Sequence, residues 1–180
     1  MQWFDIANAV GNVAKYSEDP SKEHWIAAKR ILRYLITTKD MKIVFGSSYN
    51  NEDCLIGYAD ANWASDVDTR RSTTGYLVKL FGTVISWKSQ RQHTEATSNT
   101  EAEYMALYAA SQEVIWLKRL LQELQVIETE ATKIWQDNQG TIALAKNPIF
   151  HDSRNASRCI DQVGLKMQVT RVHFKYRYEE

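Results

Sequence analysis

The longest regular pattern in the sequence is a helical one that runs without interruption over residues 99–125. Apolar positions recur along it at the three- and four-residue spacing of an amphipathic helix that packs on a core. The face defined by this spacing contains Tyr104, Leu107, Tyr108, Ser111, Val114, Ile115 and Lys118. This segment therefore predicts one long helix that packs on the rest of the fold.

Short apolar and aromatic runs on both sides of this helix predict strands. Before the helix they cover residues 54–58, 75–81 and 84–88, and Gly82 separates the last two at hairpin spacing. After it come a short buried strand at 133–136, a short helix at 139–146 that stops before Pro148, and an alternating strand pattern at 169–178. Together they predict an antiparallel-rich α/β domain.

The first part of the chain predicts a helical hairpin. Apolar residues recur at helical spacing over residues 5–35, and the pattern breaks at 17–21, where Pro20 and Ser21 supply a turn and a helix start. The polar, turn-rich stretch GSSYNNED at residues 46–53 follows and is a plausible domain boundary.

Composition places the chain among globular proteins with one domain, or one domain and an appendage. It has 180 residues, of which 44% are hydrophobic and 24% charged, with only 7 Gly and 2 Pro. The 22 basic residues balance the 22 acidic ones. No overall basic field therefore points to nucleic acid, and any such binding must come from a local patch.

Cysteines and the N-terminus indicate a reducing compartment. Cys54 and Cys159 lie far apart and form neither a CxxC pair nor a Cys/His cluster, so neither a disulfide framework nor a zinc site is predicted. The N-terminal residues lack the pattern of a signal peptide, and no run of eighteen apolar residues occurs. We expect a soluble, intracellular chain, in the cytoplasm or the nucleus.

Three acidic residues stand at the ends of predicted elements. Asp60 follows the apolar run CLIGY, Asp137 ends the strand KIWQ, and Glu103 lies in the first turns of the long helix on its apolar side. If the two strands are neighbours and the helix crosses them, the three carboxylates converge into one acidic pocket. Such a pocket suits Mg²⁺, and a pair of these ions about 3.5–4 Å apart promotes phosphodiester cleavage, which indicates a nuclease.

Each carboxylate also has a purely structural interpretation. Asp60 can be a turn residue at a strand end, and Asp137 can be the N-cap of the helix that follows it. Glu103 can be a charge that the helix macrodipole stabilises. The residues alone leave both interpretations open.

Longer stretches of the sequence resemble one family. The segments GYADANWASD, RRSTTGYLVKLFGTVISWKSQRQ, TSNTEAEYMAL and WQDNQGTIALAKNP are similar, in that order, to the ribonuclease H (RNase H) domain of copia-type LTR retrotransposon polyproteins. The resemblance is dense over residues 54–150. Residues 5–35 resemble the connecting region that follows the reverse transcriptase in the same polyproteins.

This resemblance implies an RNase H fold, with a five-stranded mixed sheet flanked by helices and, here, an N-terminal helical hairpin before it. It implies hydrolysis of the RNA strand of RNA/DNA hybrids with two Mg²⁺ ions, for which Mn²⁺ is a possible substitute. Asp60, Glu103 and Asp137 match the first three catalytic and metal-binding carboxylates of the family. Glu101 is the rival to Glu103, which we prefer because it falls on the apolar side of the helix.

The resemblance also indicates substrate contacts. Donors on Ser98, Asn99 and Gln139 would lie beside the carboxylates and meet phosphates or 2′-hydroxyls. Four residues are candidates for a local basic rim: Arg70, Arg71, Lys88 and Arg91. An equal alternative is that these side chains simply form a solvated surface.

The sequence departs from the family after Pro148. One alignment makes Asp161 the fourth catalytic and metal-binding carboxylate after a short insertion, and the other places His173 at that position. We choose Asp161 because it keeps an oxygen ligand. His151 matches a family histidine that could assist protonation, although a surface histidine is the simpler reading, and Cys159 replaces a histidine with no evident chemistry.

The resemblance divides the chain into a helical remnant of the connecting region at 1–46 and an RNase H-like domain at 54–180, atypical from about residue 151. No YxDD-type polymerase site is present, which suggests a truncated reading frame derived from a retrotransposon. In the parent element, the corresponding protein would be part of the retrotransposon particle. The N-terminal helices would pack on reverse transcriptase subdomains, on a self-partner or on the RNase H domain. The alternative to an active ribonuclease is a catalytically weak remnant that binds nucleic acid or protein.

Overall fold

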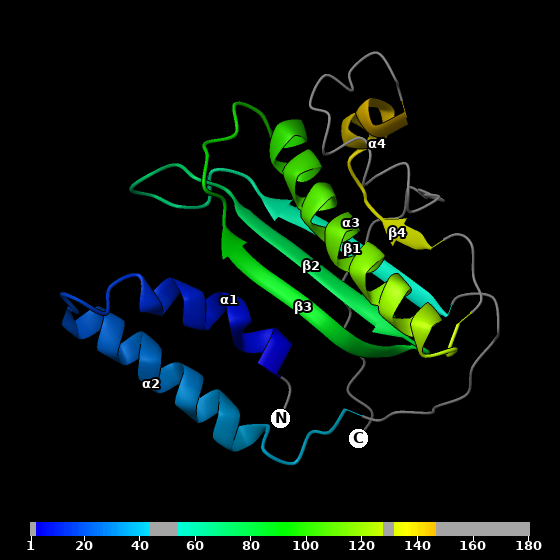
Figure 1. Cartoon of the computed structure of the whole chain (residues 1–180). Coiled ribbons are helices and arrows are strands. Elements are labelled where there is room, and N and C mark those ends of the chain that lie inside the picture. Colours follow the sequence, from blue (N-terminus) through cyan, green and yellow to red (C-terminus); the bar gives the residue numbers. More distant parts are fainter. Residues whose placement is uncertain (1–2, 44–53, 128–131, 147–180) are drawn as a thin grey trace.

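A four-stranded mixed sheet forms the centre of the molecule (Figure 1). The computed structural model describes residues 3–43, 54–127 and 132–146. Within them the sheet has the order β3-β2-β1-β4, in which β1 pairs antiparallel with β2, β2 antiparallel with β3, and β4 parallel with β1. The strands are β1 Leu55–Asn62, β2 Thr73–Leu80, β3 Thr83–Arg91 and β4 Lys133–Trp135.

The predicted α/β architecture with a mixed sheet flanked by helices is confirmed, but the strand count is four in the described part of the chain, not five. The strand pattern at residues 169–178 lies outside the described residues. Strands β1 and β3 are also longer than the sequence indicated. The polar ends of β1 and β3 extend because both keep pairing with β2, for example Asn62 with Thr73 and Thr73 with Arg91.

The turn between β2 and β3 follows from two residues with left-handed backbone angles. Phe81 has φ 48° and Gly82 has φ 77°. Two consecutive positive φ values are the signature of a two-residue turn whose twist matches the strands of a hairpin. Glycine adopts this conformation readily, whereas Phe81 does so at a steric cost.

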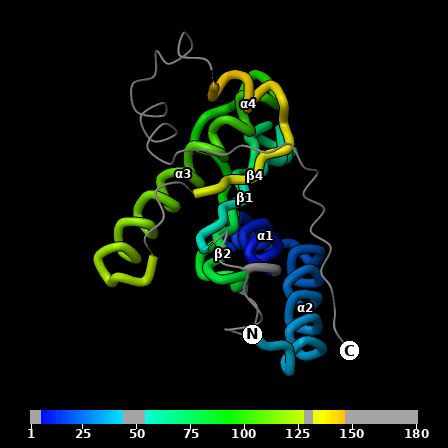
Figure 2. The backbone as a smooth tube through the Cα atoms, turned by 90° about the vertical axis from the view of Figure 1, so that its right-hand side faces the viewer, coloured from blue at the N-terminus to red at the C-terminus, as the bar shows by residue number. Residues whose placement is uncertain are grey.

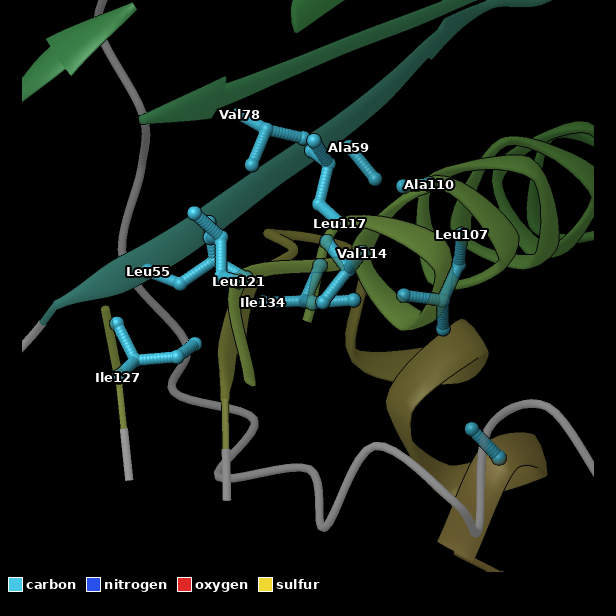
Figure 3. Close-up of a cluster of buried hydrophobic side chains, with 11 residues drawn as sticks. Leu55, Ala59, Val78, Leu107, Ala110, Val114, Leu117, Leu121, Ile127 and Ile134 are labelled. Atoms are coloured by element: carbon cyan, nitrogen blue, oxygen red, sulfur yellow. The ribbon is translucent and has the colours of Figure 1, made fainter. Parts of the chain in front are cut away.

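Helix α3, Asn99–Glu123, crosses one face of the sheet and provides five of the eleven residues of the main core cluster (Figures 1 and 3). Gly57 explains how closely it approaches: a Cβ at this position would lie 3.1 Å from side-chain atoms of both Val114 and Ile134. The main cluster of buried apolar residues comprises Leu55, Ala59, Val78, Leu107, Ala110, Val114, Leu117, Leu121, Ile127, Ile134 and Ala145. Helix α4, Gln139–Lys146, follows β4 and packs against α3.

The predicted N-terminal hairpin consists of α1, Trp3–Ala14, and α2, Lys22–Thr37. Helix α2 begins after Ser21, as predicted, where the Ser21 backbone N–H donates to His24 Nδ1 at 3.0 Å. Figure 2 shows the hairpin on the opposite side of the sheet from α3, with α1 next to the sheet and α2 outside it. Helix α1 contacts β3, and Asn8 Nδ2 donates to Ser89 Oγ at 3.2 Å.

None of the helices described is both long and apolar enough to cross a membrane.

Candidate metal centre

Strand pairing brings Asp60 and Asp137 to the same end of the sheet. Strand β4 runs parallel to β1, with Tyr58 opposite Trp135, and each aspartate lies two residues beyond this pair. Asp60 is still within β1, whereas Asp137 follows the last residue of β4. Since parallel strands present their carboxyl ends at one edge, the two side chains become neighbours.

Glu103 completes the group from helix α3. It lies one turn into the helix, on the side that packs on the sheet, and its side chain is only 4% exposed. One carboxylate oxygen from each of Asp60, Glu103 and Asp137 lies within 4.8 Å of the other two. The convergence expected from the sequence is therefore present.

Burial and neighbouring negative charge raise the pKa values of Glu103 and Asp60. Burial, followed by the charges of Asp60 and Asp137, raises the pKa of Glu103 to about 7, although a hydrogen bond from Gln136 opposes this change. Burial and then the Asp137 charge also raise the pKa of Asp60. Both changes favour the protonated carboxyl groups of Glu103 and Asp60, whereas a bound divalent cation would favour their ionised forms.

Gln136 connects the carboxylates to the backbone of the β4–α4 turn. Its side chain is fully buried, and Nε2 donates to Glu103 Oε2 at 3.2 Å. Its Oε1 accepts from the backbone N–H groups of Asp137 at 2.7 Å and Asn138 at 3.1 Å. The sequence reasoning missed this residue. The signal available in the sequence was the alternation of buried and exposed side chains along this segment, because Gln136 lies two residues after Ile134 and therefore on the same buried side.

Glu101 and Glu103 have different surroundings. Glu101 Oε2 accepts from both the backbone N–H and the hydroxyl of Thr97, each at 2.7 Å, and its side chain is exposed. These hydrogen bonds lower the pKa of Glu101. Glu101 thus caps the N-terminal end of α3, and of the two residues only Glu103 belongs to the carboxylate cluster.

The expected substrate-contacting donors lie at the starts of the two helices beside the cluster. Ser98 is the N-cap of α3 and accepts from the Glu101 N–H at 3.2 Å, while Asn99 is the first residue of that helix and is exposed. Gln139 is the exposed first residue of α4. The two helix starts touch, since Thr141 Oγ1 donates to the Thr100 carbonyl at 3.0 Å.

The four candidates for a basic rim do not form one group. Arg91 binds Asp66, with Nη1 at 3.1 Å from Oδ2, and Lys88 lies on β3. Arg70 and Arg71 belong to the loop between β1 and β2. Arg70, Lys88 and Arg91 are exposed, whereas Arg71 is half-buried.

The chemistry of the cluster fits divalent metal ions that prefer oxygen ligands. It offers three carboxylates and no sulfur or imidazole ligand among the described residues. Asp161, the predicted fourth ligand, and its alternative His173 lie outside the described residues, as does His151.

Comparison with known proteins identifies the relatives of this chain. No protein-family model matches it. The Pol polyprotein of transposon TNT 1-94 from Nicotiana tabacum is 48% identical over 147 residues, which are 82% of this chain and 11% of the relative. The Pol polyprotein of transposon RE2 from Arabidopsis thaliana is 39% identical over 165 residues, 92% of this chain and 11% of the relative.

A shorter relative and a solved structure were also found. The secreted RxLR effector protein 161 of Plasmopara viticola is 50% identical over 113 residues, 63% of this chain and 78% of that protein. The structure of an RNase H1 isolated from compost, LC11-RNase H1, has 16% sequence identity and a TM-score of 0.47, and covers 66% of this chain and 84% of that chain.

The expected resemblance is thus confirmed at the level of sequence, over a segment that makes up about a tenth of the Pol polyproteins. This chain is homologous to a segment of copia-type retrotransposon Pol polyproteins.

Proposed function

We propose that this chain hydrolyses the RNA strand of RNA/DNA hybrids. The observation that carries the proposal is the cluster of Asp60, Glu103 and Asp137, held by the ends of β1 and β4 and the start of α3. These three residues occupy the positions that the RNase H resemblance assigns to catalytic carboxylates. A structural role alone would not require three carboxylates within 4.8 Å of one another.

The proposed site takes two Mg²⁺ ions, with Mn²⁺ as a substitute, on Asp60, Glu103 and Asp137, and with Asp161 as the fourth ligand. When bound, such ions supply an activated water and stabilise the leaving oxygen of the scissile phosphodiester. The protein's part is to fix the oxygen ligands. Gln136 does so for Glu103 through a hydrogen bond, and the pairing of β1 with β4 does so for the two aspartates.

Substrate recognition in this proposal depends on groups at the rim of the cluster. Ser98, Asn99 and Gln139 lie at two touching helix starts, where side-chain donors can meet phosphates and 2′-hydroxyls. Arg70 and Arg71, in the β1–β2 loop, would meet the phosphate backbone. A hybrid would thus be recognised mainly by its shape and by its 2′-hydroxyls, not by base sequence.

In the experiment, the purified full chain is incubated in Mg²⁺ and in Mn²⁺ with three labelled substrates of one sequence. These are an RNA/DNA hybrid, the single-stranded RNA and the DNA duplex. The proposal predicts cleavage of the RNA within the hybrid only. Binding of the hybrid without cleavage in either metal would refute hydrolysis and favour the alternative, a catalytically weak remnant that binds nucleic acid.

A further inference from the structure

Asp66 is a buried carboxylate at a place where nothing in the proposed chemistry uses one. It belongs to the β1–β2 loop, residues 63–72, which begins three residues after Asp60 at the carboxylate end of the sheet. Asp66 is only 5% exposed. A charge buried to this degree must be compensated by cations and donors.

The compensation comes partly from the loop and partly from the N-terminal hairpin. Thr69 donates to Oδ1 from both its backbone N–H and its hydroxyl, each at 3.0 Å. On the other oxygen, Oδ2, Lys15 Nζ lies at 2.7 Å and Arg91 Nη1 at 3.1 Å. Lys15 directly follows α1, so its ion pair joins segments 51 residues apart in the sequence.

These bonds hold the loop in a conformation that it would not adopt freely. Ala64 and Arg70 have left-handed backbone angles, φ 48° and 55°, which are unfavourable for residues with a Cβ. The Arg70 N–H donates to the Asp66 carbonyl at 2.8 Å, and the Asp66 N–H donates to the Arg71 carbonyl at 3.1 Å. Asp66 therefore fixes the backbone that presents Arg70.

The same loop presents an aromatic ring at Trp63, three residues after Asp60. Trp63 is 46% exposed, and its Nε1 donates to the Ala96 carbonyl at 3.2 Å, in the segment that leads into α3. The loop thus contacts the hairpin through Asp66 and the segment before α3 through Trp63. It exposes the Trp63 indole and the Arg70 side chain to solvent. Indole faces pack on bases and sugars, and guanidinium groups bind phosphates.

We propose that Lys15 is a positioning residue for substrate binding: through Asp66 it fixes the β1–β2 loop so that Trp63 and Arg70 meet the hybrid. This inference rests on the proposed function. It gives the N-terminal hairpin, which lies on the opposite side of the sheet from α3, a role in binding nucleic acid.

The test measures hybrid affinity by fluorescence anisotropy in Mg²⁺, in an Asp60→Asn background that prevents turnover. Lys15→Met is expected to raise Kd about three- to tenfold, an effect that the remaining Arg91 limits. Lys15→Arg keeps the ion pair and restores affinity. Two controls leave Kd within about twofold: Lys22→Met removes the same charge at the exposed start of α2, and Asn8→Ala removes the bond from α1 to Ser89.

Hydrogen exchange of the free protein provides a second readout that needs no substrate. Lys15→Met should accelerate exchange of the Asp66 and Arg70 amides and leave the amides of β1 and β2 unchanged. An unchanged Kd, an equal loss of affinity in Lys22→Met, or unchanged loop exchange would overturn the inference while leaving hybrid cleavage by the parent chain intact. Failure of the unaltered protein to bind or cleave the hybrid would instead refute the proposed function.

Discussion

Glu103 combines deep burial with two acidic neighbours, and its ionisation should be visible in the stability of the metal-free protein. Its pKa is about 7 in the folded state against an ordinary value of 4.5. Between these values the folded protein binds more protons than the unfolded chain, so the free energy of unfolding falls as the pH rises. The stabilisation is fully present below pH 4.5 and is lost as the pH rises through 7.

The first prediction is therefore a difference between two proteins. From pH 4.5 to 8 the unaltered chain should lose up to about 3 kcal/mol of stability that Glu103→Gln does not lose. Denaturant unfolding in the presence of a chelator measures it. Parallel pH profiles for the two proteins would contradict the assigned pKa. Adding Mg²⁺ at pH 8 should stabilise the unaltered protein more than the variant.

Gln136 is the residue whose loss should disturb the site most without removing a carboxylate. Gln136→Met leaves the buried carboxylate of Glu103 and the N–H groups of Asp137 and Asn138 without their partner, so we expect a loss of about 1–3 kcal/mol. The loss should be larger at pH 8 than at pH 5, because the hydrogen bond favours ionised Glu103. Gln139→Met, at an exposed position, is the matched control and should change stability by less than about 0.5 kcal/mol. Equal effects of the two substitutions would contradict the role given to Gln136.

At the scale of elements, the distance between α3 and the sheet is set by Gly57. A methyl group at this position would press on Val114 and Ile134, both of which are fully buried. Gly57→Ala should therefore destabilise the protein by about 1–3 kcal/mol. Gly11→Ala is the contrast: no atom lies within 4 Å of the added methyl, and alanine in a helix interior should stabilise by about 0.5–1 kcal/mol. Thermal unfolding of both variants decides the matter, and a neutral Gly57→Ala would show that the helix can move away from the sheet.

The helices and strands were largely predictable from the sequence, and so was the convergence of β1, β4 and α3 at the carboxylate cluster. Period and turn signals located α3, α4 and the β2–β3 hairpin, and Asp60 and Asp137 converge because a parallel pair of strands brings their ends together. The Lys15–Asp66 ion pair was not predictable, since no local pattern tells which cation reaches a carboxylate 51 residues away. For Gln136 the sequence held only a weak signal, namely a polar residue on the buried side of a predicted strand.

At the scale of the whole molecule, α2 presents an open apolar surface. It contains no buried residue, and among its large apolar side chains Leu32 is 56% exposed and Ile36 69% exposed. Surfaces of this kind commonly mark contacts with other proteins. The suggested partners of the N-terminal helices, reverse transcriptase subdomains or a second copy, remain predictions.

This open surface makes its own prediction for the isolated chain. Leu32→Gln and Ile36→Gln should each change stability by no more than about 0.5 kcal/mol, because both side chains stay mostly exposed to water in the folded chain. Leu107→Ala, in the core, should cost about 2–5 kcal/mol. Chemical denaturation measures all three. A loss above about 1 kcal/mol for either α2 variant would show that the surface is covered in the isolated protein.

The measurement that tests the central claim most directly is the rate of hybrid cleavage in Mg²⁺ by the full chain and three single variants. Asp60→Asn and Glu103→Gln remove carboxylates of the cluster, whereas Glu101→Gln changes a carboxylate two residues away that caps α3. The account predicts cleavage by the unaltered chain and by Glu101→Gln, and a loss of at least about a hundredfold in the other two. Cleavage that survives Asp60→Asn and Glu103→Gln would contradict it.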